Sequence, residues 1–137
     1  MSYLVDTNVL SELRKGRRCD PGVAAWFARV ASEEIYLSAL TLGEIRKGIE
    51  SIRRRDAAAA LALEAWFQQL VATYSDRFLP VDLAVAEQWG RFNVPQPLPV
   101  LDSLLAATPK VHGLILVTRN VKDVERTGVA CLNPFRE

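Results

Sequence analysis

Tyr3-Leu-Val-Asp-Thr-Asn-Val-Leu10 is a short apolar run followed by an acid, a hydroxyl and an amide. The apolar run from Leu4 has the pattern of a buried strand. Thr7 and Asn8 can begin a helix directly after it, which leaves Asp6 at the carboxyl end of the strand. Open parallel sheets place their chemistry at that edge, so Asp6 is the first candidate functional residue.

Length and composition limit the class of protein. The chain has 137 residues, half of them hydrophobic, and we expect residues 1–137 to form one domain. The formal net charge of +1 argues neither for nor against nucleic acid. Cys19 and Cys131 lack metal-type spacing, which favours a reducing cytoplasm. The amino terminus has no signal-peptide pattern, and no apolar run approaches the roughly 20 residues that span a bilayer.

Strand-like runs alternate with helical segments, which is typical of an α/β protein with a mostly parallel sheet. The first strand-like run ends at Asp6. The other four are Ile35–Ala39, Phe78–Val81, Leu114–Val117 and Val129–Leu132. Helices are expected over Asn8–Arg14, from Asp20-Pro21, from Thr41, over Asp56–Tyr74, from Asp82 and over Pro99–His112. Proline disrupts a helix interior, so Pro109 predicts a kink or an early end.

Right-handed crossovers bring four carboxylates to one edge of such a sheet: Asp6, Glu44, Asp102 and Asp123. Three of these acids have ordinary structural alternatives. Thr41 and Glu44 match a capping box, Asp102 suits the first turn of a helix, and Asp123 suits an exposed turn. Asp6 is the hardest to explain in this way, because a partly buried carboxylate without a partner is costly. If all four converge, a cation must offset their repulsion, and Mg²⁺ or Mn²⁺ suits oxygen ligands.

Two further groups of residues, one basic and one apolar, can each be interpreted in two ways. Arg119 and Arg46 stand next to the acidic positions, where they either contact phosphates or are solvated surface charges. Apolar residues cover more than one face of the helix after Asp56, which suggests a dimer or a groove for a protein partner. These apolar residues are Leu61, Leu63, Trp66, Phe67, Leu70 and Val71.

The order and spacing of five segments resemble the PIN domain, specifically the VapC/FitB-like toxins of bacterial toxin–antitoxin pairs. The segments are Leu4–Leu13, Ser38–Ile45, Pro99–Ala107, Leu116–Asp123 and Gly128–Phe135. The resemblance implies a three-layer α/β/α fold with a central sheet of four to five strands. It implies that Asp6, Glu44, Asp102 and Asp123 form the catalytic, metal-binding quartet, with Thr7, Asn8, Thr118 and Asn120 as supporting polar groups.

The same resemblance implies a toxin that cuts RNA, often tRNA or rRNA, with a water activated by Mg²⁺, for which Mn²⁺ can substitute. It also implies a homodimer blocked by a cognate antitoxin, a VapB/FitA-like DNA-binding protein, with promoter DNA contacted only through the antitoxin. No membrane partner is implied.

Two alternative functions stay open. The first is a catalytically inactive PIN-fold module that binds RNA or a protein partner, although retention of all four acids disfavours it. The second is a Mg²⁺-dependent phosphatase with Asp6 as covalent nucleophile. Such phosphatases usually carry a second acid two residues later, and here that residue is Asn8.

Overall fold

The computed structural model describes residues 1–136, which build a five-stranded parallel sheet in the order β3-β2-β1-β4-β5. The strands are β1 (Tyr3–Val5), β2 (Ile35–Ser38), β3 (Phe78–Leu79), β4 (Ile115–Val117) and β5 (Cys131–Leu132). Tyr3 pairs with Ile35 on one side and with Ile115 on the other. The first strand is therefore central, and Asp6 emerges between the carboxyl ends of β2 and β4.

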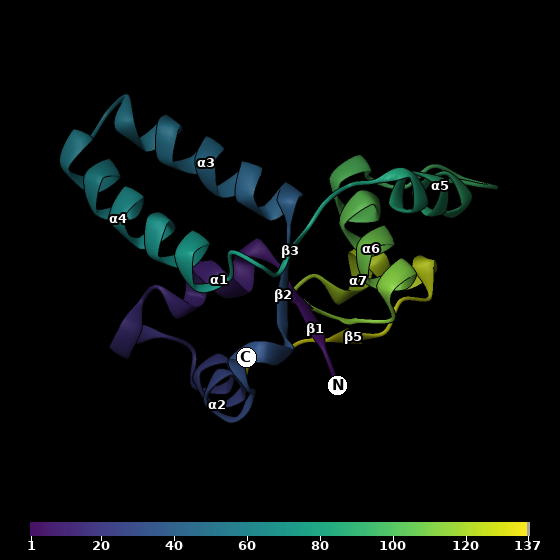
Figure 1. The fold of residues 1–137 in the computed structure, drawn as a ribbon, viewed down its shortest axis with the longest axis horizontal. Helices are drawn as coiled ribbons and strands as arrows, with labels where there is room; N and C mark the ends of the chain where they lie inside the picture. The colour runs from purple at the N-terminus through teal and green to yellow at the C-terminus, as the bar shows by residue number, and fades with distance from the viewer. Residues whose placement is uncertain (137) are drawn as a thin grey trace.

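Helices cover both faces of the sheet (Figure 1). They are α1 (Thr7–Leu13), α2 (Pro21–Arg29), α3 (Ala39–Arg53), α4 (Ala57–Thr73), α5 (Leu83–Phe92), α6 (Val100–His112) and α7 (Val121–Val124). Residues of α1 to α4 pack in one core, and residues of α5 to α7 pack in another. Within the described residues, no helix is long and apolar enough to cross a membrane.

Alternation along the strands separates these two cores. Leu4 and Leu116 belong to the core with α6 and α7, whereas Val5 and Val117 belong to the core with α1 to α4. Successive side chains of a strand point to opposite faces, so two adjacent apolar residues serve both layers. This arrangement confirms the predicted three-layer α/β/α architecture and its parallel sheet.

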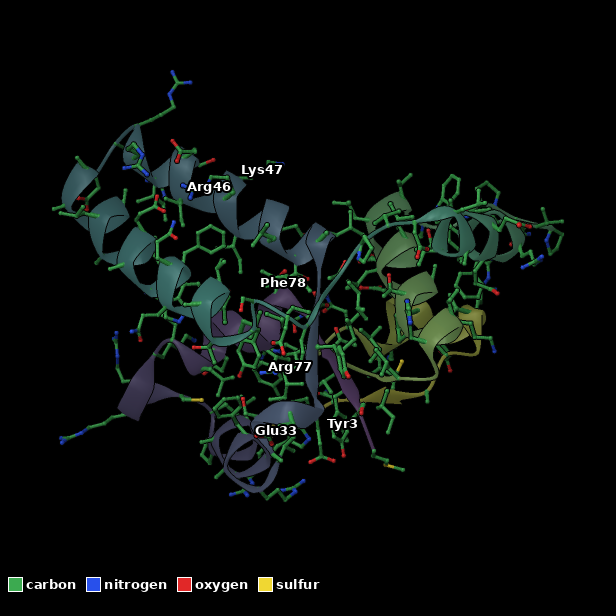
Figure 2. The ribbon with its side chains drawn as sticks, viewed as in Figure 1. Tyr3, Glu33, Arg46, Lys47, Arg77 and Phe78 are labelled. Atoms are coloured by element: carbon green, nitrogen blue, oxygen red, sulfur yellow. The ribbon has the colours of Figure 1, made fainter. Side chains whose placement is uncertain are left out.

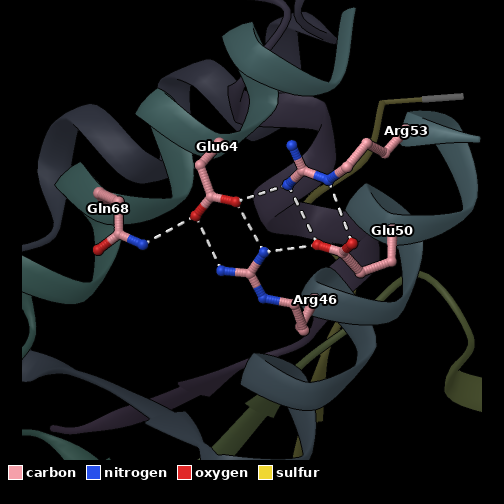
Figure 3. Close-up of polar contacts among 5 residues, drawn as sticks. All are labelled: Arg46, Glu50, Arg53, Glu64 and Gln68. Carbon is pink, nitrogen blue, oxygen red and sulfur yellow. Dashed lines mark hydrogen bonds and ion pairs between the residues drawn. The ribbon is translucent and has the colours of Figure 1, made fainter. Parts of the chain in front are cut away.

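Charged side chains tie α3 to α4 (Figure 3). The Arg46 guanidinium donates to both Glu64 carboxylate oxygens, at 2.7 and 2.8 Å, and to Glu50 at 3.0 Å. Arg53 also bridges Glu50 and Glu64, and the Arg46 guanidinium lies 5.0 Å from the centre of the Phe67 ring. Hydrogen bonds from Arg46 lower the pKa of Glu64 to about 2.

The start of α3 differs from the prediction. The N-cap is Ser38, whose hydroxyl oxygen accepts a hydrogen bond from the Leu40 amide at 3.0 Å. The capping box of Thr41 and Glu44 is therefore wrong, since Thr41 lies inside the helix and is fully buried. Glu44 consequently belongs to the second turn of α3 rather than the first.

Pro109 does not end α6, which continues to His112 as a helix. The expected early end is wrong. Pro109 and the three residues before it are all buried, and we attribute the continuation to this packing, which offsets the one lost backbone hydrogen bond. Gly113 then stops the helix, with a left-handed φ of 68°.

Candidate active site

A pocket of about 260 Å³ opens at the carboxyl edge of the sheet. It receives side chains from the ends of β1 and β4 and from helices α1, α3 and α6, which lie far apart in the chain. Three of the four predicted carboxylates line it. The lining residues are Asp6, Thr7, Asn8, Glu44, Leu101, Asp102, Leu105 and Asn120.

Asp6 is held by a network of hydrogen bonds. Its carboxylate accepts the Thr7 backbone amide at 2.7 Å, the Thr118 hydroxyl at 2.8 Å and the Asn8 side-chain amide at 3.3 Å. The Thr118 hydroxyl in turn accepts the Asn120 backbone amide at 3.1 Å. All four predicted supporting residues therefore belong to one network centred on Asp6, although their function remains a prediction.

Burial raises the pKa of the Asp6 carboxyl above its ordinary value, and this effect outweighs the hydrogen bonds from Thr118 and Thr7. The nearby charges of Glu44 and Asp102 raise that pKa further. Burial also raises the pKa of Asp102, followed by the charge of Asp123. Such shifts mark a cluster in which negative charge is costly in the absence of a cation.

Glu44 reaches the pocket from α3, where its carboxylate accepts a hydrogen bond from the Thr7 hydroxyl at 3.0 Å. Asp123 lies beside the pocket rather than in it. It lines an adjoining hollow together with Asn120, which the two hollows share. The structure thus brings Asp6, Glu44 and Asp102 into one pocket and leaves Asp123 as the exposed neighbour.

Sequence reasoning missed the contact that holds α6 in place. Ser103, next to Asp102, is buried; its hydroxyl donates to the Pro99 carbonyl at 2.7 Å and accepts the Trp89 indole N–H at 3.0 Å. This side chain links α5 to the first turn of α6. A serine after a candidate acid gives no local signal of such a role, because its partner comes from another helix.

The residues that line the acidic pocket have the ligand chemistry that suits a hard divalent cation. Among residues 1–136, no three Asp, Glu, His or Cys side chains already stand close enough to hold a metal ion. The pocket nevertheless offers only oxygen ligands of the kind preferred by Mg²⁺ and Mn²⁺. The raised pKa values of Asp6 and Asp102 indicate the surplus of negative charge that such an ion would neutralise.

The two arginines singled out from the sequence have different surroundings. Arg46 does not line the acidic pocket, and its guanidinium is engaged with Glu64 and Glu50; Figure 2 shows it on α3 beside Lys47. Arg119 lies at the acidic edge, where its backbone amide donates to the Asn8 side-chain oxygen at 3.2 Å. The predicted contacts of both arginines with substrate stay predictions.

A second, more apolar hollow of about 240 Å³ lies between α3, α4 and the α1 segment that includes Ser11 and Arg14. It shares Thr7 and Glu44 with the acidic pocket, so the two hollows adjoin at these residues. Leu63 and Trp66 from the predicted apolar surface of α4 form part of its wall, opposite Ile45, Ile49 and Ile52 of α3.

Comparisons with known proteins find similar sequences and similar folds. The family model of the PIN domain matches residues 3–129. Toxin FitB of Neisseria gonorrhoeae is 30% identical over 139 residues, which cover 98% of this chain and 99% of FitB. VapC ribonuclease Y4jK of Sinorhizobium fredii is also 30% identical over 139 residues, covering 96% of each protein.

Solved structures show the same likeness. The crystal structure of FitAcB from Neisseria gonorrhoeae matches with a TM-score of 0.89 and 28% identity, covering 98% of this chain and 99% of that one. The structure of FitAB bound to an IR36 DNA fragment matches with a TM-score of 0.88 and 28% identity, covering 98% and 96%.

Proposed function

This chain belongs to the PIN-domain family, and from that premise we propose that it is the toxin of a toxin–antitoxin pair and an endoribonuclease dependent on Mg²⁺. The observation that carries the proposal is the pocket that unites Asp6, Glu44 and Asp102 around the hydrogen-bonded Asp6 carboxylate. The substrate is RNA, with tRNA or rRNA as the expected target, and the protein acts in the cytoplasm as a single domain.

In this mechanism the residues that would hold the cation are Asp6 and Asp102, with Glu44 and Asp123 as further ligands. When bound, the cation would lower the pKa of a coordinated water and stabilise charge on the scissile phosphate. Thr118 and Asn8 fix the orientation of the Asp6 carboxylate, and Thr7 fixes that of Glu44. Leu101 and Leu105 form the apolar part of the pocket wall.

The apolar hollow beside α3 and α4 supports the proposal that a protein partner binds this chain. A helical or extended segment of the antitoxin that fills it would reach Glu44, which lines both this hollow and the acidic pocket. Occupation of the hollow would therefore obstruct the site. By analogy with the FitAB complex on DNA, we propose a FitA- or VapB-like antitoxin that contacts promoter DNA, and a homodimer of the toxin.

A catalytically inactive PIN module is the second candidate. One observation favours it: within the described chain, no three acidic, histidine or cysteine side chains are already positioned around a common metal site. The retained hydrogen bonds to Asp6 and the shared pocket favour the enzyme instead, because a binding module has no need to bury a carboxylate beside two others.

One experiment separates the two candidates. The purified protein is incubated with total RNA in Mg²⁺ and, in parallel, in EDTA. We expect cleavage only with Mg²⁺, and a loss of about 100-fold or more in Asp6→Asn and Asp102→Asn, since metal-bound charge stabilisation contributes several kcal/mol. Glu33→Gln, an exposed acid outside the pocket, is the matched control and should cleave normally. RNA binding without cleavage in Mg²⁺ would favour the inactive module.

A further inference from the structure

The second hollow, which adjoins the acidic pocket at Thr7 and Glu44, has a polar wall and an apolar wall. The polar wall is one face of α1 and its C-cap, because Thr7, Ser11 and Arg14 follow each other at intervals of four and three residues and all line the hollow. The apolar side chains come from α3 and α4, and they are Ile45, Ile49, Ile52, Leu63 and Trp66. A ligand that fills this hollow therefore needs one polar side and one apolar side.

The polar wall begins at the candidate active site. Thr7 lines both hollows, and its hydroxyl donates to the Glu44 carboxylate at 3.0 Å. An α-helix rises about 1.5 Å per residue, so Arg14 lies about 10 Å further along α1 than Thr7. Arg14 lines the second hollow but not the acidic pocket. An anionic group bound by Arg14 is therefore a neighbour of the group held at Asp6, not the same group.

Arg14 is the first of three arginines in the loop between α1 and α2. Arg14, Arg17 and Arg18 are exposed, and among residues 1–136 no carboxylate forms an ion pair with any of them. Arg46 and Arg53, in contrast, both bind the Glu50 and Glu64 carboxylates. Clustered cations without acidic partners repel one another, and a bound polyanion relieves that repulsion.

One buried carboxylate holds this loop in place. The Lys15 ammonium donates to one Glu12 oxygen at 2.9 Å, and the Asp20 backbone amide donates to the other at 2.8 Å. Both ends of the short 3-10 helix Gly16–Arg18 are thereby joined to α1. The backbone that carries Arg17 and Arg18 is ordered before a ligand arrives, which lowers the entropic cost of binding.

We infer that the RNA strand leaves the acidic pocket through the second hollow, with its backbone along the polar face of α1 and a base against the apolar wall. Arg14 binds the phosphate next to the one that is cut, and Arg17 and Arg18 bind phosphates beyond it. Single-stranded RNA has a charged backbone and bases with apolar faces, so it matches both walls. The inference rests on the proposed ribonuclease function and adds a substrate channel to it. An antitoxin segment in the hollow would compete with RNA for this channel.

Fluorescence anisotropy with labelled single-stranded RNA in EDTA tests the channel without cleavage. We expect Arg14→Ala to weaken binding about fivefold and to reduce the slope of log affinity against log salt by about 0.7, the value for one lost phosphate contact. Arg17→Ala/Arg18→Ala should reduce the slope by about 1.4, for two contacts. Arg14→Lys keeps the charge and should keep the slope.

The matched control for charge is Arg54→Ala/Arg55→Ala. These two arginines are exposed in the turn between α3 and α4, which lies apart from the loop between α1 and α2 in Figure 1. The control removes the same charge as Arg17→Ala/Arg18→Ala and should leave both affinity and slope unchanged.

Tryptophan fluorescence tests the apolar wall. RNA should change the emission of the wild-type protein, and this change should be lost in Trp66→Phe, because Trp66 lines the hollow. Trp26→Phe is the control and should keep the change, since Trp26 is buried in the core. Neither reading depends on cleavage.

Steady-state cleavage in Mg²⁺ gives a third reading. Arg14→Ala should raise KM about fivefold and change kcat little, because it removes binding that is equally strong before and during the chemical step. A loss confined to kcat would contradict a role in holding the strand.

Wild-type affinity and slope in Arg14→Ala would overturn the channel, and so would an equal loss in Arg54→Ala/Arg55→Ala. Poly-glutamate that displaces labelled RNA as well as unlabelled RNA of the same charge would overturn the assignment to RNA and favour an acidic protein segment. In each case the ribonuclease proposal stands if the wild-type protein still cuts RNA with Mg²⁺. A wild-type protein that neither binds nor cuts RNA defeats the proposed function, and the channel with it.

Discussion

The Thr118 hydroxyl donates a hydrogen bond of 2.8 Å to the Asp6 carboxylate across 112 residues of sequence. The contact forms because β1 and β4 are neighbours in the sheet, with Val5 paired to Val117. Asp6 and Thr118 therefore follow their strands at matching positions along the carboxyl edge of the sheet. Burial nevertheless outweighs this hydrogen bond in setting the pKa of Asp6, so the pKa of its carboxyl is higher than the ordinary value.

The raised pKa of Asp6 predicts a pH-dependent difference between wild type and Asp6→Asn. A raised folded-state pKa means that the native protein binds more protons than the unfolded chain above the ordinary pKa of 3.8, so stability falls as pH rises through the folded pKa. Asparagine cannot ionise and avoids this loss. In EDTA, the melting temperature of Asp6→Asn should increase relative to that of wild type as the pH rises above about 4. A constant difference across that range would contradict the raised pKa.

Divalent cations should stabilise the wild-type protein. An ion that binds only the native state adds about 2.7 kcal/mol at a concentration about 100 times its Kd. We expect Mn²⁺ to raise the melting temperature of wild type, and this increase to disappear in Asp102→Asn. Glu33→Gln serves as the control with an equal loss of charge. An equal increase in all three proteins would place the ion outside the pocket.

Ser103→Ala tests the link between α5 and α6. The substitution leaves the Trp89 indole N–H without its acceptor, and an unpaired group of this kind costs about 1–2 kcal/mol. Urea unfolding should show this decrease in the free energy of unfolding. Ser51→Ala, an exposed residue in the last turns of α3, should change it little. A similar cost in the two variants would mean that the link contributes nothing specific.

Arg46→Ala should act on stability and leave RNA cleavage intact, because this guanidinium joins α3 to α4 and does not line the acidic pocket. We expect a lower melting temperature and an unchanged rate at a temperature where the variant is folded. The stability that the Arg46–Glu64 salt bridge contributes should be full above about pH 4.5. It should be lost progressively as the pH falls from there to the Glu64 pKa of about 2. A large loss of cleavage by folded Arg46→Ala would instead support the predicted substrate contact.

Local signals in the sequence were sufficient for the starts of three helices. Asp20, Asp56 and Asp82 each precede a helix and each caps it with a side-chain oxygen. The start of α3 could not be predicted in this way, because Ser38 and Thr41 are both hydroxyl residues suited to capping. The pairing of Ser38 with Leu79 in β3 ends the strand at Ser38, and this choice depends on tertiary structure.

The candidate site was predictable to the extent that topology determines it. Asp6, Glu44 and Asp102 share a pocket because parallel strands and their helices bring those positions to one edge. The partners of these residues were not predictable. Trp89 reaches Ser103 from another helix, and Phe135 reaches Arg119 from the end of the chain. Neither contact leaves a periodicity or a spacing that can be read locally.

Because β1 lies in the middle of the sheet, its two neighbours are synthesised at very different times: β2 follows soon after β1, whereas β4 begins only at Ile115. A nascent polypeptide that stalls on the ribosome before Ile115 carries Asp6 without its second flanking strand and without Thr118. A premature stop codon there therefore yields a fragment with an unfinished pocket. The cell meets whatever chemistry this pocket performs only after the ribosome has translated β4 and Thr118.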